Sequence, residues 1–111
     1  MSVHRLGPLD EIAENDALGY AVTEGDAKRK LVVARWTGEV YAYLNRCPHA
    51  GTPLDWVPDK FLDRSRSYLI CQTHGALFEV EDGECIDGPC LGDRLEPVTV
   101  RIVDGEIEVE L

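Results

Sequence analysis

The sequence predicts an all-β domain built from antiparallel sheets. Apolar and polar residues alternate over short segments, most clearly at 98–102 and 107–111. Turn residues such as Asp104-Gly105 separate these segments. No long stretch has the apolar spacing of an amphipathic helix. With 111 residues, the chain suits one domain, residues 1–111, with a modest core.

The first half of the chain contains four predicted strands. We expect strands at 3–7 and 17–23, separated by a helical turn at 8–12 that has a proline early and acidic residues in its first turn. Residues 31–36 and 40–44 form a predicted hairpin over Thr37-Gly38-Glu39. Within 40–44, aliphatic residues alternate with two tyrosines, so one face should be aliphatic and the other aromatic.

The second half contains two short strands, 67–70 and 77–80, a turn at 81–84 and the hairpin of 98–102 with 107–111. Between the halves, residues 55–67 carry four large apolar side chains among charges: Trp56, Val57, Phe61 and Leu62. These side chains either tuck onto the core as a satellite cluster, which we favour, or form a docking face.

Two short motifs combine a thiol with an imidazole. They are Cys47-Pro48-His49 and Cys71-Gln72-Thr73-His74, and each follows a predicted strand. Thiolate and imidazole ligands suit zinc or an iron–sulfur centre rather than magnesium or calcium. Zinc modules usually pair cysteine with cysteine and histidine with histidine. One cysteine and one histidine per loop better suits a [2Fe–2S] cluster, which can take one ligand for each iron from each loop.

These motifs resemble the Rieske family. The resemblance rests on Cys-Pro-His-Ala-Gly-Thr-Pro-Leu at 47–54, Cys-Gln-Thr-His-Gly-Ala-Leu-Phe at 71–78, and Gly88-Pro89, which is similar to the proline loop that covers the family's cluster. It implies one [2Fe–2S] cluster per chain, with Cys47, His49, Cys71 and His74 as cofactor and metal ligands. It also implies a Rieske-like sandwich in which a small cluster-binding subdomain, about residues 45–80, is carried by base sheets. The gap between the motifs is longer here than in the family's compact ferredoxins.

The resemblance also bears on the reduction potential. High-potential members carry a disulfide between the loops, and hydroxyl donors two and four residues after the second histidine. Ala76 and Phe78 stand at those two positions here, and Ala50, Gly51 and Gly75 flank the histidines. The resemblance therefore implies the low-potential, ferredoxin-like class.

The sequence favours an electron carrier over an enzyme. A 2-His-1-carboxylate iron site needs two histidines beyond the cluster's two, and the chain has three in all. The third, His4, suits a strand or surface position. No glycine-rich motif for a flavin or nicotinamide is present.

We therefore expect a component of a dioxygenase system that takes an electron from a reductase and passes it to a terminal oxygenase, both docking near His49 and His74. A small subunit of a nitrite-reductase-like complex is the alternative with the same chemistry. A zinc-stabilised interaction module is the alternative from another class.

The net charge of −10 bears on partners and location. It disfavours nucleic acid and anionic membranes, and it either attracts a basic docking face or only aids solubility. The basic run Lys28-Arg29-Lys30 is short, which suits a solvated strand start. Because the sequence contains no membrane-length apolar run and no signal-peptide pattern, we expect a cytoplasmic protein.

Cys85 and Cys90 lie outside both motifs, in a stretch rich in turn residues. They are either two small buried apolar residues, which we favour, or a disulfide or redox pair.

Overall fold

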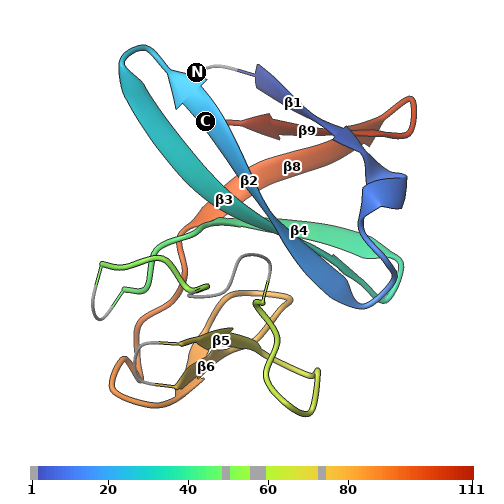
Figure 1. The fold of residues 1–111 in the computed structure, drawn as a ribbon. Coiled ribbons are helices and arrows are strands. Elements are labelled where there is room, and N and C mark those ends of the chain that lie inside the picture. The colour runs from blue at the N-terminus through green and yellow to red at the C-terminus, as the bar shows by residue number, and fades with distance from the viewer. Residues whose placement is uncertain (1–2, 49–50, 56–59, 73–74) are drawn as a thin grey trace.

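Two antiparallel sheets make up the fold (Figure 1). The computed structural model describes residues 3–48, 51–55, 60–72 and 75–111. The larger sheet has six strands in the order β1-β9-β8-β4-β3-β2. Their bounds are β1 Val3–Pro8, β2 Asp16–Glu24, β3 Ala27–Trp36, β4 Glu39–Leu44, β8 Pro97–Val103 and β9 Glu106–Glu110.

The smaller sheet has the strand order β5-β6-β7. Its strands have three residues each: β5 Leu69–Cys71, β6 Ala76–Phe78 and β7 Cys85–Asp87. In Figure 1 it lies at one end of the molecule, and both termini lie at the other end, along the larger sheet.

The β3–β4 hairpin separates two apolar clusters. Val32, Ala34 and Tyr43 belong to the first cluster, which contains all four cysteines and the inward residues of the small sheet. Leu31, Val33 and Ala42 belong to the second cluster, with residues of β8, β9 and the turn after β1. Since successive side chains of a strand point to opposite faces, this hairpin is buried on both faces.

The all-β prediction is confirmed, and the predicted division of residues 40–44 is confirmed with it. Tyr41 and Tyr43 pack in the first cluster, and Val40, Ala42 and Leu44 pack in the second. The predicted helical turn is a 3-10 turn, η1 (Leu9–Glu11). The described residues contain no other helical element, and no helix among them could cross a membrane.

Two boundaries differ from the expectations. β3 begins at Ala27, four residues before the predicted start, because the whole of β2 pairs with it. β7 was not expected, because its sequence, Cys85-Ile86-Asp87, is short and leads directly into a turn. It forms by pairing with β6.

Within the segment 55–67, Phe61 is buried and Leu62 packs against the first cluster. These two side chains therefore form part of the core, as favoured above, rather than a docking face. Trp56 and Val57 lie outside the described residues.

Candidate metal centre

Cys47 and Cys71 lie at the ends of two different sheets. Cys47 follows β4 of the larger sheet, and Cys71 is the last residue of β5. Their exposed fractions are 1% and 0%, and both belong to the first apolar cluster. All four cysteines of the chain are thiols rather than disulfides. The fold thus brings two reduced, water-excluded cysteines into one core from separate strands.

The loops that begin at these cysteines have the same backbone closure. The Gly51 N–H donates to the Cys47 carbonyl at 2.7 Å, and the Gly75 N–H donates to the Cys71 carbonyl at 2.9 Å. Both glycines have left-handed backbone conformations, with φ of +71° and +73°. Glycine adopts this conformation without steric cost, and such i to i+4 closures end one tight turn. The two loops are therefore equivalent although their Cys-to-His spacings differ.

A chain of hydrogen bonds joins the loops to each other. The Gln72 N–H, next to Cys71, donates to the Leu54 carbonyl at 3.0 Å. The Leu54 N–H in turn donates to the Asn45 side-chain oxygen at 2.7 Å, and the Asn45 amide donates to Asp55 at 2.9 Å. Asn45 is a buried polar side chain, 8% exposed, and these bonds satisfy it. Sequence reasoning missed Asn45, although an asparagine two residues before a ligand loop offers both a donor and an acceptor there.

Gly88 packs tightly against the second loop. A β-carbon added to Gly88 would lie 2.8 Å from the Ala76 α-carbon, and the φ of Gly88 is +100°. Only glycine fits this contact without displacement. The Gly88-Pro89 segment therefore lies against the second motif, as the resemblance to a proline loop predicts.

Cys85 and Cys90 form a pair of buried thiols beside this centre. The Cys90 thiol donates to Cys85 Sγ at 2.9 Å, and the Cys85 thiol donates to the Asp87 carbonyl at 3.2 Å. Burial and the hydrogen bond with Cys85 raise the pKa of Cys90 to about 12. Cys90 is therefore a neutral thiol at ordinary pH, which agrees with the favoured interpretation as small buried residues.

The histidines divide into two groups. His49 and His74 lie outside the described residues. His4 lies in β1 opposite Val109, and its Nε2 is buried without a hydrogen-bond partner. Within the described ranges, no three side chains of histidine, cysteine, aspartate or glutamate gather as a metal site.

Comparison with known proteins identifies the domain. The family model described as "Rieske [2Fe-2S] domain" matches residues 2–104. The chain belongs to the Rieske family. Two curated relatives, both named apoptosis-inducing factor 3, are 32% identical (Mus musculus) and 34% identical (Homo sapiens) over 80 residues. The match covers 72% of this Rieske domain and 12% of each relative, so the chain spans a small part of their length.

Solved structures share the fold. The terminal oxygenase of carbazole 1,9a-dioxygenase from Nocardioides aromaticivorans IC177 aligns with a TM-score of 0.76 and 25% identity, over 98% of this chain and 30% of that one. A chain from a complex of reduced oxygenase and oxidised ferredoxin in carbazole 1,9a-dioxygenase aligns with a TM-score of 0.74 and 21% identity, over 96% of this chain and 91% of that one.

The described residues fit the family's cofactor, a [2Fe–2S] cluster. Such a cluster takes two thiolates on one iron and two imidazoles on the other. Cys47 and Cys71 supply two thiols at the starts of two equivalent loops, in a core that excludes water. Both motif histidines follow within four residues of those cysteines in sequence.

Proposed function

We propose that this Rieske domain carries one electron at a time from a reductase to a terminal oxygenase, and that Cys47, His49, Cys71 and His74 hold its cluster. Family membership supports electron transfer on a [2Fe–2S] cluster. The observation that carries the ligand assignment is the identical backbone closure of the two loops, each of which begins at one of these cysteines. Each loop holds one of the two histidines in sequence.

The residues of the chain hold and shield the centre. The bound cluster supplies one-electron chemistry between its oxidised and reduced forms. The cysteine side chains lie in the apolar core, which excludes water from the thiolate side. The glycine closures and the Gln72–Leu54 bond hold the two loops in fixed relation, which lowers the structural change that accompanies a change of charge.

The choice of partners rests on a weaker likeness. One similar chain comes from a ferredoxin–oxygenase complex, and the alignment covers 91% of its length. The chain's three histidines leave one beyond the proposed ligands, which is too few for a further 2-His-1-carboxylate iron site within these 111 residues. An oxygenase that accepts the electron would therefore use its iron on another chain or segment.

The ligand assignment is tested by substitution. C47S and C71S should each lose the cluster or change its spectrum strongly, because serine replaces a soft thiolate by a hard alkoxide or alcohol. The double variant C85A/C90A is the matched control, since it also removes buried thiols, and it should keep full iron and sulfide content. Iron and sulfide analysis with electron paramagnetic resonance of the reduced protein gives the result. A C47S protein with the parent's iron, sulfide and spectrum would overturn the assignment, and stoichiometric zinc without iron would overturn the cofactor.

The partner assignment needs a reconstitution. The reductase and oxygenase encoded beside this chain would be purified and mixed with it in a stopped-flow instrument. We expect the visible spectrum of the cluster to bleach with NADH only when the reductase is present, and to recover when the oxygenase and oxygen are added. An intact cluster that exchanges no electrons with either protein would contradict this assignment.

A further inference from the structure

A groove of about 270 Å³ beside the first ligand loop is lined by four cationic side chains and by no carboxylate. We call it the basic groove. Its lining residues are Lys28, Arg29, Lys30, Leu44, Asn45, Arg46, Gly51 and Pro53. The charge of this groove is opposite in sign to the net charge of the chain, −10.

The β3–β4 pairing brings these cations together. Leu31 at the start of β3 pairs with Leu44 at the end of β4, and the Asn45 N–H donates to the Lys30 carbonyl at 2.9 Å. The basic run therefore lies beside the chain as it enters the first ligand loop. Sequence analysis treated this run as a solvated strand start, because Arg46 is 16 positions away from Lys30 in sequence.

Arg46 links the groove to the ligand loop. It directly precedes Cys47, and its guanidinium lies 3.7 Å from the position of a β-carbon built on Gly51, the residue that closes the loop. It also lines a second hollow with Pro48 and Arg94. A cation at this place is within a Debye length, about 8–10 Å at ordinary salt, of the loop backbone, so its field there is only partly screened.

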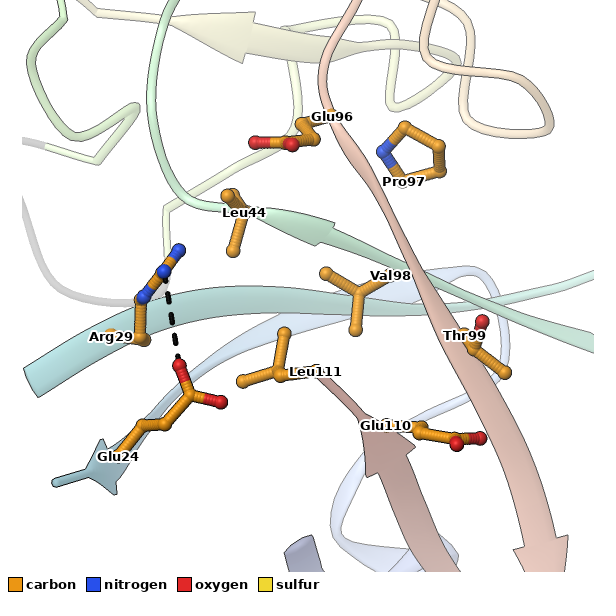
Figure 2. Close-up of a pocket in the computed structure, with 9 residues that line it drawn as sticks. All are labelled: Glu24, Arg29, Leu44, Glu96, Pro97, Val98, Thr99, Glu110 and Leu111. Carbon is orange, nitrogen blue, oxygen red and sulfur yellow. Dashed lines mark ion pairs between the residues drawn. The ribbon is translucent and has the colours of Figure 1, made fainter. Parts of the chain in front are cut away.

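The cations of the groove differ in how far they are compensated. Arg29 pairs with Glu24 at 3.8 Å, and Figure 2 shows this pair in a neighbouring pocket that also contains Glu96 and Glu110. Lys28, Lys30 and Arg46 are exposed, and within the described part of the chain none of them forms a side-chain ion pair. Three uncompensated cations thus face solvent beside the loop.

We propose that the basic groove is the surface on which a redox partner docks, through carboxylates of an acidic face. This inference rests on the proposed function and adds the charge of the partner's surface. Opposite potentials steer association and fix orientation, and a groove beside the ligand loop holds the partner near the electron's exit. Nucleic acid fits less well, because net charge −10 repels a polyanion beyond the groove.

The first test compares two charge-reversal variants of the holoprotein. K30E/R46E changes the groove, and R5E/R101E changes exposed strand positions in β1 and β8. Each reversal changes the net charge by −2, so both variants go from −10 to −14. Any difference between them is therefore local rather than global.

The readout is stopped-flow oxidation of the reduced cluster by two probes, ferricyanide and the cation tris(phenanthroline)cobalt(III). At low ionic strength, K30E/R46E should react with ferricyanide about tenfold more slowly than R5E/R101E, a change at the low end of electrostatic steering effects. It should react faster with the cobalt cation, and both differences should shrink in high salt. Equal rates for the two variants with both probes would overturn the docking surface and leave the proposed function standing. A cluster that no acceptor oxidises would instead overturn the proposed function.

The second test locates the carboxylate site without electron transfer. Poly-L-glutamate should perturb the amide resonances of residues 28–30 and 45–46 in the parent protein and in R5E/R101E, but not in K30E/R46E. Perturbation confined to other residues would overturn the proposal. A short duplex DNA that perturbs the groove at lower concentration than poly-L-glutamate would show a nucleic-acid site instead.

Discussion

At the scale of single residues, the environment of the cysteines consists of small or apolar side chains. Ala76 is 1% exposed and pairs with Cys71 across β5 and β6, and Phe78 is fully buried on the same strand. Directly paired residues have their β-carbons about 4.5–5.5 Å apart. A hydroxyl at position 76 would therefore lie beside Cys71, at a place where the protein now offers no side-chain donor.

We predict that A76S and F78Y each raise the reduction potential. A hydrogen bond to the more negative, reduced cluster stabilises it, and a charge-assisted bond contributes about 1.5–3 kcal/mol. Since about 1.4 kcal/mol corresponds to roughly 60 mV for one electron, each shift should be tens of millivolts or more. Protein-film voltammetry measures it, with A21S on exposed β2 as the matched control. Unchanged potentials in both variants would contradict the expected influence of these positions.

The parent potential itself follows from the same absence of hydroxyl donors. We expect it in the lower part of the Rieske range, which runs from about −150 to +300 mV. A measured value above roughly +150 mV would mean that other donors replace the absent hydroxyls.

Tyr43 gives a second prediction at this scale. Its hydroxyl donates to the Val80 carbonyl at 2.7 Å inside the first cluster, and burial, followed by the nearby Asp82 carboxylate, raises its pKa well above the usual value near 10. Above pH about 10 the unfolded chain loses this proton while the folded chain keeps it. The stability that Tyr43 contributes is therefore complete below pH 10 and falls as the pH rises.

Y43F should lower the free energy of unfolding at pH 7 by about 1–3 kcal/mol, because it leaves the buried Val80 carbonyl without its donor. It should also reduce the fall of stability above pH 10. Urea unfolding of the parent and Y43F at pH 7 and at pH 10 to 11 checks both effects. The same alkaline slope in the two proteins would contradict the assignment to Tyr43.

At the scale of elements, the second ligand loop is held from two sides. β5 and β6 enclose it, and the segment after β7 packs on Ala76 through Gly88. β7 pairs with β6 at Leu77 and Phe78, so the contact at Gly88 depends on that short strand. The three-residue β7 matters because it brings Gly88 to the ligand loop.

G88A should destabilise the protein and shorten the lifetime of the bound cluster. The added β-carbon would lie 2.8 Å from the backbone of Ala76, so the loop or the segment must move. G25A is the matched control, because Gly25 also has a positive φ, +61°, but has nothing within 4 Å of its added β-carbon. Each substitution includes the strain of a left-handed alanine, about 1–2 kcal/mol. Melting temperature and the rate of iron loss to a chelator give the comparison, and equal effects of G88A and G25A would contradict the packing argument.

At the scale of the whole molecule, the two apolar clusters divide the fold by role. The first contains the four cysteines and the small sheet, and the second contains residues of the larger sheet, such as Ile107 and Val109, with no cysteine. The cluster cofactor binds the folded state, so its removal should destabilise the first region directly. The larger sheet has its own core and less reason to open.

Removal of the iron should therefore loosen one region and spare the other. We predict that the apoprotein loses amide protection at 45–48, 51–55, 60–72 and 75–90, and keeps it at 16–24 and 97–110. Hydrogen–deuterium exchange of holoprotein and apoprotein, followed by mass spectrometry, measures this. Uniform loss of protection over both regions would mean that the two clusters unfold as one cooperative unit.

Much of the fold could be predicted from local patterns. The alternation in residues 40–44 and 107–111 assigns each side chain to a face, and Asp104-Gly105 assigns a hairpin. These features depend on neighbours in sequence, where residue type determines backbone preference. β7 escaped prediction because three residues carry too little periodicity, and its formation depends on pairing with β6.

The same division holds for the site and its surroundings. The pairing of one thiol and one imidazole in each motif specifies the chemistry of the centre, because ligand type selects the metal. The sequence by itself therefore determined the family, the all-β class and the cofactor. Only the tertiary structure decided that Asn45 joins the loops, that Gly88 packs on Ala76, and that the basic run meets Arg46. The physical reason is that these contacts join residues that are far apart in sequence, through backbone pairing and close packing that local preferences do not encode.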